Sequence, residues 1–502
     1  MDRSNGATTN EPDPLNKAIR SGALLSYGGF LSGKLISFLT MVVLARLLAP
    51  EDFGLVAIGF LVLAVNEALT EAGAGAAVVW RRGDLGVTAA VALSLSLVSG
   101  AAMALVVYLS ADTVADFFAA PDASGVIRAF AFCILLSSPS AVFSGILQRR
   151  MAFGRRIIPD IAKAATKAVF GIPMALAGFG VWSLVASHVV SIAVGLGLAV
   201  WLAGWRPRLS LDRAEMRAIL PYVLQTAAIG LLGMAIRKLD VVIVGHRFET
   251  EVLGHYTLAF SLIELVVLGI CWSASQALFP ALSQNVDNAA RLQQVFSRGL
   301  TVLLGVTLPV AVGMALMAEP FILTVFGQKW APAIPLMQIL AFYALIYSTG
   351  FNLGDIYKAT GRPQILTWIG AFNLVLAVPI LLAGSYWGVA GIAGGQVAVA
   401  CVITIVNWIV AGRVIGIGIG VLGGAIYRPL VATLGGAMAC LAADWALGNA
   451  ASPALRVIVM SAVASIAYAL LILLLFPVTW RRKPDAAVTD QGSLRKNITE
   501  AE

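Results

Sequence analysis

Long apolar runs constrain this chain more than any other feature of its sequence. A helix needs about 20 mostly apolar residues to cross the hydrocarbon core of a membrane. Fourteen such runs cover residues 22–45, 54–77, 86–109, 126–147, 158–179, 181–203, 219–244, 254–276, 299–317, 334–356, 365–384, 387–411, 425–447 and 455–477. They are continuously apolar, which is typical of transmembrane helices and excludes an alternating β-barrel pattern. The sequence therefore predicts an all-α integral membrane protein with about fourteen transmembrane helices.

The composition excludes a soluble protein and points to no cofactor. Only 12% of the residues are charged, which is about half of the share in soluble domains. The four cysteines fall in apolar runs without a CxxC pair, so neither a disulfide nor a metal site is expected. The net charge of +8 does not indicate nucleic-acid binding, because cytoplasmic loops of membrane proteins collect Lys and Arg.

The distribution of basic residues predicts the orientation of the chain. With the N-terminus on the cytoplasmic side, 24 Lys and Arg fall in cytoplasmic loops and tails and five fall on the opposite side. Such an excess is typical of cytoplasmic segments. We therefore expect both termini in the cytoplasm.

Paired motifs indicate an internal duplication at a spacing near 200 residues. Gly54 is matched by Gly254, loop tips at 152–155 and 359–362 read Ala-Phe-Gly-Arg and Ala-Thr-Gly-Arg, and His188 is matched by Gln396. The three offsets are 200, 207 and 208 in the same order. Each repeat contains six spans, so both halves insert the same way and form a parallel repeat around a central cavity.

The duplication and the loops together predict the domain boundaries. The segments are a cytoplasmic tail (1–20), a first six-helix lobe (21–205), a cytoplasmic linker (206–218), a second six-helix lobe (219–412), two extra C-terminal helices (425–477) and a cytoplasmic tail (478–502).

Four segments carry a resemblance to a known family. Residues 44–54, Leu-Ala-Arg-Leu-Leu-Ala-Pro-Glu-Asp-Phe-Gly, are similar to the first-loop signature of polysaccharide exporters and lipid-linked oligosaccharide flippases (Wzx-like). These belong to the multidrug/oligosaccharidyl-lipid/polysaccharide exporter superfamily. Residues 238–245, 279–283 and 359–362 also resemble that family. The resemblance covers roughly residues 15–480, although His246 and Arg247 depart from its usual small or aromatic residues.

The resemblance implies a two-lobed, fourteen-helix transporter in the bacterial inner membrane. Such a protein moves an undecaprenyl-pyrophosphate-linked glycan from the cytoplasmic to the periplasmic leaflet by alternating access, for exopolysaccharide, O-antigen or capsule biosynthesis. Membrane lipids, a polysaccharide polymerase and a chain-length regulator are the expected partners. No catalytic residue and no cofactor are implied, apart from coupling to H⁺ or Na⁺.

Charges at membrane depth are the candidate site residues, because they are expensive to place there. Lys34 lies in the middle of the first span, and Arg237 and Lys238 lie in its duplicated counterpart. Cations from both lobes would match an anionic pyrophosphate. Alternatively, Arg237 pairs with Asp240 one turn away, or the cations snorkel.

A second group of charges follows one face of the fifth span. Asp160, Lys163 and Lys167 are spaced at i, i+3 and i+7, which places them on the same side of a helix. They form either a stripe that guides an anion or a local ion pair with snorkelling lysines.

Three carboxylates in the second and eighth spans complete the candidates. Glu67, Glu71 and Glu264 are either H⁺ or Na⁺ coupling sites or countercharges for the buried cations.

Two other functions stay open, a cation-coupled multidrug antiporter of the same superfamily and a membrane polymerase or glycosyltransferase. The longest polar stretch between spans, around 277–298, is under about 25 residues and offers no domain to hold a sugar chain, which disfavours the enzyme. The deep charges contain one more cation than anion, and this favours an anionic substrate over a cationic drug.

Overall fold

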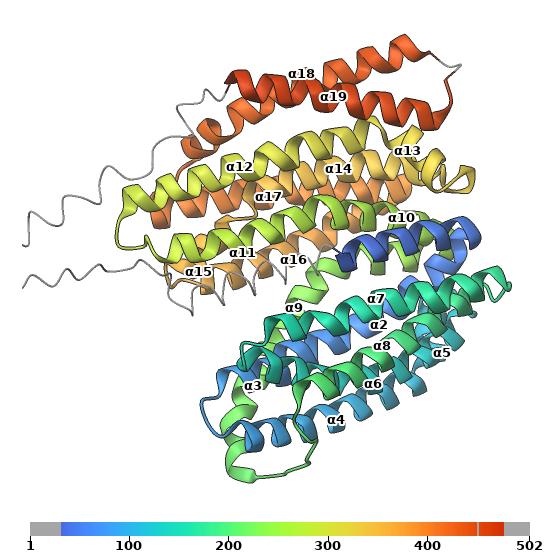
Figure 1. Cartoon of the computed structure of the whole chain (residues 1–502), viewed down its shortest axis with the longest axis vertical. Helices are drawn as coiled ribbons and strands as arrows, with labels where there is room; N and C mark the ends of the chain where they lie inside the picture. The colour runs from blue at the N-terminus through green and yellow to red at the C-terminus, as the bar shows by residue number, and fades with distance from the viewer. Residues whose placement is uncertain (1–31, 449–450, 476–502) are drawn as a thin grey trace, which may run out of the picture.

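The computed structural model describes residues 32–448 and 451–475, and all regular elements in these ranges are helical. The predicted tails (1–20 and 478–502) and the beginning of the first predicted span lie outside the described residues. The predicted all-α fold class is confirmed. Figure 1 shows long helices running nearly parallel in two groups, with α9 between them.

The first group contains the helices that precede the linker. They are a helix over residues 32–47, α2 (Pro50–Thr70), α3 (Ala76–Trp80), α4 (Leu85–Leu109), α5 (Ala111–Phe117), α6 (Ala123–Arg149), α7 (Phe153–Leu176) and α8 (Val181–Ala203). The short π-helix η1 (Glu71–Gly75) joins α2 to α3 without a break.

The second group repeats this pattern and ends with two further helices. Its elements are α9 (Arg213–Arg247), α10 (Thr250–Ile263), the π-helix η2 (Glu264–Leu268), α11 (Gly269–Ser283), α12 (Ala289–Leu316), α13 (Ala318–Val325), the 3₁₀ turn η3 (Gln328–Trp330), α14 (Ala333–Gly350), α15 (Leu353–Ala359), α16 (Gln364–Gly384), the 3₁₀ turn η4 (Ser385–Trp387) and α17 (Gly388–Ile415). The additional helices α18 (Ile419–Leu447) and α19 (Pro453–Leu475) lie at the outer edge, beside α12.

Eleven stretches in the described residues are long and apolar enough to cross a membrane. The fourteen predicted spans differ from this number at identifiable places. One stretch, Gln364–Arg413, contains both α16 and α17. The charged helix α7 is not among the eleven, and the first helix has only residues 32–47 described. The number of crossings therefore stays a prediction.

Side-chain caps fix the beginnings of three of the long helices. Asp84 accepts from the Val87 N–H at the start of α4, and Asn288 accepts from the Arg291 N–H at the start of α12. Asp212 accepts from two N–H groups at the start of α9. These caps satisfy amides that have no partner within the helix.

The two glycines that mark the duplication lie at the contact between the lobes. A Cβ atom on Gly54 would lie 1.8 Å from the Thr250 carbonyl oxygen, and one on Gly254 would lie 1.9 Å from the Pro50 carbonyl oxygen. Pro50 and Thr250 are themselves separated by the offset of 200. A contact that is repeated in reverse is what a two-fold relation produces. The α2–α10 crossing therefore lies on the pseudo-two-fold axis of the duplication.

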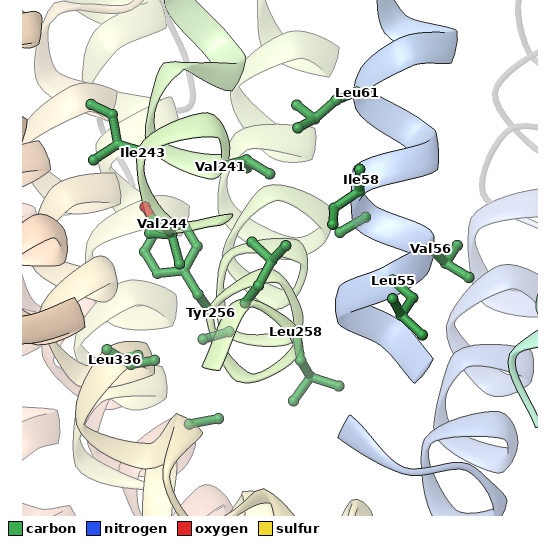
Figure 2. Close-up of a cluster of buried hydrophobic side chains, with 14 of the residues drawn as sticks. Leu55, Val56, Ile58, Leu61, Val241, Ile243, Val244, Tyr256, Leu258 and Leu336 are labelled. Carbon is green, nitrogen blue, oxygen red and sulfur yellow. The ribbon is translucent and has the colours of Figure 1, made fainter. Parts of the chain in front are cut away.

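A continuous apolar core joins the lobes around this crossing. Figure 2 shows Ile58 and Leu61 of α2 on the side that faces Val241 of α9. All three belong to one cluster of buried side chains that also includes Tyr256 and Leu258 of α10. Van der Waals packing of these side chains holds the interface together, because lipid is as apolar as the side chains and provides no hydrophobic driving force between helices.

Hydrogen bonds fasten the lobes at the same end of the molecule. The Trp330 indole donates to the Ala45 carbonyl at 2.8 Å, and the Lys329 ammonium donates to the Arg46 carbonyl at 2.9 Å. Arg46 Nε in turn donates to the Val325 carbonyl at 2.8 Å. The lobes are thus tied together at the end where α2 and α10 begin.

At the opposite end, the first half of α9 is attached to the first lobe. Ile219 is buried in a cluster with Ala77 and Val91, and the Glu215 carboxylate forms an ion pair with Arg81 at 3.2 Å. Hydrogen bonding to Glu215 raises the pKa of the Arg81 guanidinium. The helix that was predicted to open the second lobe therefore starts on the first.

Candidate functional site

A polar cavity of about 700 Å³ lies inside the first lobe. It is enclosed by α2, η1, α3, α6, α7 and α8, together with Tyr222 from the first half of α9. Its volume is within the range of about 300–1,000 Å³ that is usual for small-molecule sites. Unlike a packed helix-bundle core, it is lined by hydroxyl, amide and charged groups.

One wall is a stripe of neutral polar side chains on α6. Ser137, Ser140, Ser144 and Gln148 all line the cavity, and their spacing of three, seven and eleven residues places them on one helix face. At 1.5 Å per residue the stripe is about 16 Å long. The cavity therefore extends from the end of α6 to near its middle.

The facing wall is the charged stripe on α7. Asp160, Lys163 and Lys167 line the cavity together, so the predicted common face is confirmed. Lys163 Nζ lies 3.2 Å from Asp160 Oδ1, as the ion-pair alternative expected. The stem of Lys163 lies against Gly195 of α8, where a Cβ atom would come within 2.4 Å of Lys163 Cε.

His188 of α8 lies at the deep end of the cavity. Its ring stacks on Phe130 at 5.5 Å and meets Phe60 edge-on at 4.9 Å. The side chain is only 8% exposed. Neither ring nitrogen has a hydrogen-bond partner among the described residues, and the nearby Ser140 hydroxyl also has none there.

Aromatic side chains stand at the open end. Trp80, at the end of α3, stacks on Tyr222 with ring centroids 4.5 Å apart and planes 6° from parallel. Both residues line the cavity, and the Trp80 side chain is 49% exposed. The pair offers a flat apolar platform next to the polar walls.

The structure brings together only part of the predicted site. Glu67, Asp160, Lys163 and Lys167 line this cavity. Lys34, Arg237, Lys238, Asp240 and Glu264 are not among its lining residues. Glu71 begins η1, but its side chain lies outside the described residues. The transport roles of all these residues stay predictions.

Asp240 accepts hydrogen bonds from a tyrosine hydroxyl and a backbone amide. The Tyr256 hydroxyl donates to Asp240 Oδ2 at 2.7 Å, and the Val241 N–H donates to Asp240 Oδ1 at 2.8 Å. The alternative ion pair with Arg237 is not found among the described residues, where a tyrosine from α10 reaches the buried carboxylate instead.

A second cavity, of about 690 Å³, is apolar and lies beside the additional helices. Its lining includes Phe38 of the first helix, Met314 of α12, Cys440 of α18 and Val457 of α19. It can accept hydrocarbon but offers few polar groups. In residues 32–448 and 451–475 no cluster of three or more His, Cys, Asp or Glu could hold a metal ion.

The sequence analysis did not single out the serine stripe or the position of His188 beside the cavity. The signal was present, because the α6 polar residues recur at helical spacing and His188 already marked the duplication. A serine in a membrane helix is an ordinary residue that can bond its own backbone. Only the hollow beside these residues distinguishes them.

Comparisons with known proteins agree with this architecture. Residues 43–335 match the sequence model of a family described as polysaccharide biosynthesis protein. The chain is 24% identical to the lipopolysaccharide biosynthesis protein WzxC of Escherichia coli K12, over 75% of this chain and 77% of that one. It is 26% identical to the succinoglycan biosynthesis transport protein ExoT of Rhizobium meliloti, over 71% and 72%.

Two solved structures share the fold. The lipid II flippase MurJ, in an inward closed conformation, superposes with a TM-score of 0.72 and 13% identity, over 91% of this chain and 99% of that one. An inward-facing multidrug resistance transporter of the MATE family gives 0.64 and 18%, over 76% and 94%. Because the family model matches more than half of the sequence, this chain belongs to the polysaccharide biosynthesis protein family.

Proposed function

We propose that this protein is a flippase that moves a lipid-linked glycan, carried on undecaprenyl pyrophosphate, from the cytoplasmic to the periplasmic leaflet. The proposal is supported by the names of its relatives, which act in lipopolysaccharide and succinoglycan biosynthesis. It is also supported by the shared fold with a lipid II flippase. Surface polysaccharide synthesis is the process that such a protein serves.

The observation that carries the proposal is the pair of lysines in the first-lobe cavity. Lys163 and Lys167 lie ten and fourteen residues into α7, at the depth of a membrane helix interior. A cation there costs about 2.5–3.5 kcal/mol on insertion scales. An anionic pyrophosphate would offset that cost, because it accepts charge-assisted hydrogen bonds from both ammonium groups.

The second cavity supports an amphipathic substrate. A lipid-linked glycan has a charged, sugar-bearing head and a long hydrocarbon tail. The polar cavity fits the head, and the apolar cavity against α12, α18 and α19 fits part of the tail. A soluble sugar phosphate would need only the first of them.

The contacts between the lobes suggest how the site changes access. The lobes are tied together near Gly54 and Gly254, whereas the polar cavity opens toward the opposite end, where α3 and α6 finish. The excess of basic residues assigns that open end to the cytoplasm. The head would enter there and leave after the Arg46 and Lys329 hydrogen bonds break.

Energy coupling and partners are further parts of this proposal. Glu67 lines the polar cavity and is the candidate carboxylate for binding H⁺ or Na⁺ in exchange for substrate, with Glu264 as a second candidate. A polysaccharide polymerase and a chain-length regulator would take the product on the periplasmic side. Both termini would then lie in the cytoplasm.

A deletion strain tests the function. We expect it to lose surface polysaccharide and to accumulate lipid-linked repeat units whose sugars remain protected from reagents added outside the inner membrane. Expression of the wild-type chain should restore both properties. Normal polymer with altered drug resistance would contradict the proposal and favour a multidrug antiporter instead.

A further inference from the structure

The deep end of the first-lobe cavity holds polar groups that are buried but unused. A buried donor or acceptor without a partner costs the full free energy of removing that group from water. The Ser140 hydroxyl and both nitrogens of His188 are in this position among the described residues. A cost of this size persists when the groups have a partner during function.

In the second lobe, different residues occupy the corresponding positions. At the offset of 207, Ser140 and Ser144 correspond to Tyr347 and Phe351, whose rings pack together at 5.6 Å. At the offset of 208, the counterpart of His188 is Gln396, an amide in place of an imidazole. At the two serine positions the second lobe has packed aromatic rings, whereas the first lobe has serines beside a hollow.

The groups around the hollow are those that bind sugars. Serine hydroxyls, the Gln148 amide and an imidazole each donate and accept hydrogen bonds, as sugar hydroxyls do. An inorganic anion would need donors only. The Trp80–Tyr222 platform adds an apolar surface on which the face of a sugar ring can pack.

We propose that the α6 stripe and His188 form a sugar subsite for the residue that is linked directly to the pyrophosphate. This inference rests on the proposed function and adds which part of the head enters the first lobe. Lys163 and Lys167 hold the pyrophosphate on the α7 side, while Ser140, Ser144 and His188 bind the attached sugar on the α6–α8 side. Both His188 nitrogens are shielded in this conformation, so the ring turns about its Cβ–Cγ bond to meet the sugar.

A binding experiment with two matched lipids tests the subsite. The probes are undecaprenyl pyrophosphate and the undecaprenyl-pyrophosphate-linked glycan extracted from the parent strain, titrated into the purified full chain in lipid nanodiscs. We expect the wild-type chain to bind the glycan-bearing lipid at least about tenfold more tightly, the equivalent of one or two hydrogen bonds. In Ser140→Ala and His188→Phe this preference should fall by about tenfold, while binding of the bare lipid stays unchanged.

Controls separate loss of the subsite from loss of folding. Phe at position 188 keeps an aromatic ring against Phe130 and removes the hydrogen bonds. Ser96→Ala removes another buried hydroxyl that lacks a described partner but does not line the cavity, and it should keep the preference. Lys167→Ala should weaken binding of both lipids equally.

Each other outcome has a definite meaning. Equal binding of both lipids by the wild-type chain would overturn the sugar subsite and leave the flippase proposal intact. Retention of the preference in both Ser140→Ala and His188→Phe would also overturn it. Failure of the wild-type chain to bind either lipid would overturn the proposed function together with the subsite.

Discussion

The two lobes, which the sequence predicts to be repeats of one unit, differ most at their fifth helices. In the first lobe α7 carries five charged residues, whereas its counterpart α16 carries none. The neighbouring helix differs in the same sense, with serines on α6 facing a hollow. On α14, Tyr343 and Tyr347 stack at 5.6 Å, and Phe351 follows directly after that helix.

This difference indicates that the two lobes have different roles. Filling a site with aromatic rings stabilises a lobe through burial, while a polar hollow weakens it. A lobe that keeps such a hollow gives up stability for binding. This agrees with the proposal that the first lobe holds the substrate head.

The largest effect is expected when the hollow in the first lobe is filled with the aromatic rings that the second lobe carries at the same positions. Ser140→Tyr combined with Ser144→Phe should reduce export of surface polysaccharide by more than about tenfold, because the rings occupy the sugar subsite. Export is measured in a complemented deletion strain and normalised to the amount of protein in the membrane.

The matched change in the second lobe is Tyr347→Ser with Phe351→Ser. It should lower the melting temperature through lost packing and keep export per molecule near the wild-type level. Full export by the first variant, at normal protein level, would show that the hollow is not used.

The contact between the lobes gives the next largest effect. A methyl group at position 54 would lie 1.8 Å from a backbone oxygen, so Gly54→Ala must push α2 and α10 apart. We expect a loss of about 3 kcal/mol in stability, measured as a fall in the melting temperature of the purified chain. Gly394→Ala, a helical glycine with open space around it, should have little effect.

The sequence predicted much of this framework. Continuous apolar runs predicted long apolar helices, and the spacing of Gly54 and Gly254 predicted a duplication whose two glycines meet at the contact between the lobes, because both patterns are local. The shared face of Asp160, Lys163 and Lys167 followed from helical periodicity alone.

The side-chain partners and the polar cavity could not be predicted, because they depend on which residues other helices place opposite each side chain. Arg237 stands one turn from Asp240, which made that ion pair one alternative, but Tyr256 from another helix supplies the hydrogen bond. His188 and the serines looked like ordinary helix residues, because a hollow is formed by the packing of several helices. Periodicity within one helix cannot show it.

A smaller effect is expected from the polar network of the second lobe. Tyr256→Phe removes the hydroxyl that donates to the fully buried Asp240 carboxylate. Hydrogen bonds to charged groups contribute about 1.5–3 kcal/mol, and stability should fall by about 2 kcal/mol. Export per molecule should stay near normal, and a complete loss of export at normal protein level would place this network in the transport site.

The smallest effect concerns the attachment of α9 to the first lobe. Arg81→Ala removes a partly exposed ion pair with Glu215, and such pairs contribute little to stability because solvent screens them. We expect a shift of no more than a few degrees in melting temperature, which high salt also produces in the wild-type chain. A larger loss of stability would indicate that this ion pair determines where α9 starts.

The assignment of the substrate head to the first lobe is tested most directly by finding which lobe contacts the sugar. A photoreactive phenylalanine analogue can be placed at position 144 on the α6 stripe or at position 351, its counterpart in the second lobe. Membranes are irradiated, and adducts are detected by labelling of the glycan, with a strain that lacks the glycan as the blank. We predict glycan-bearing adducts at 144 and none above the blank at 351, whereas adducts at 351 alone would contradict the assignment of the substrate head to the first lobe.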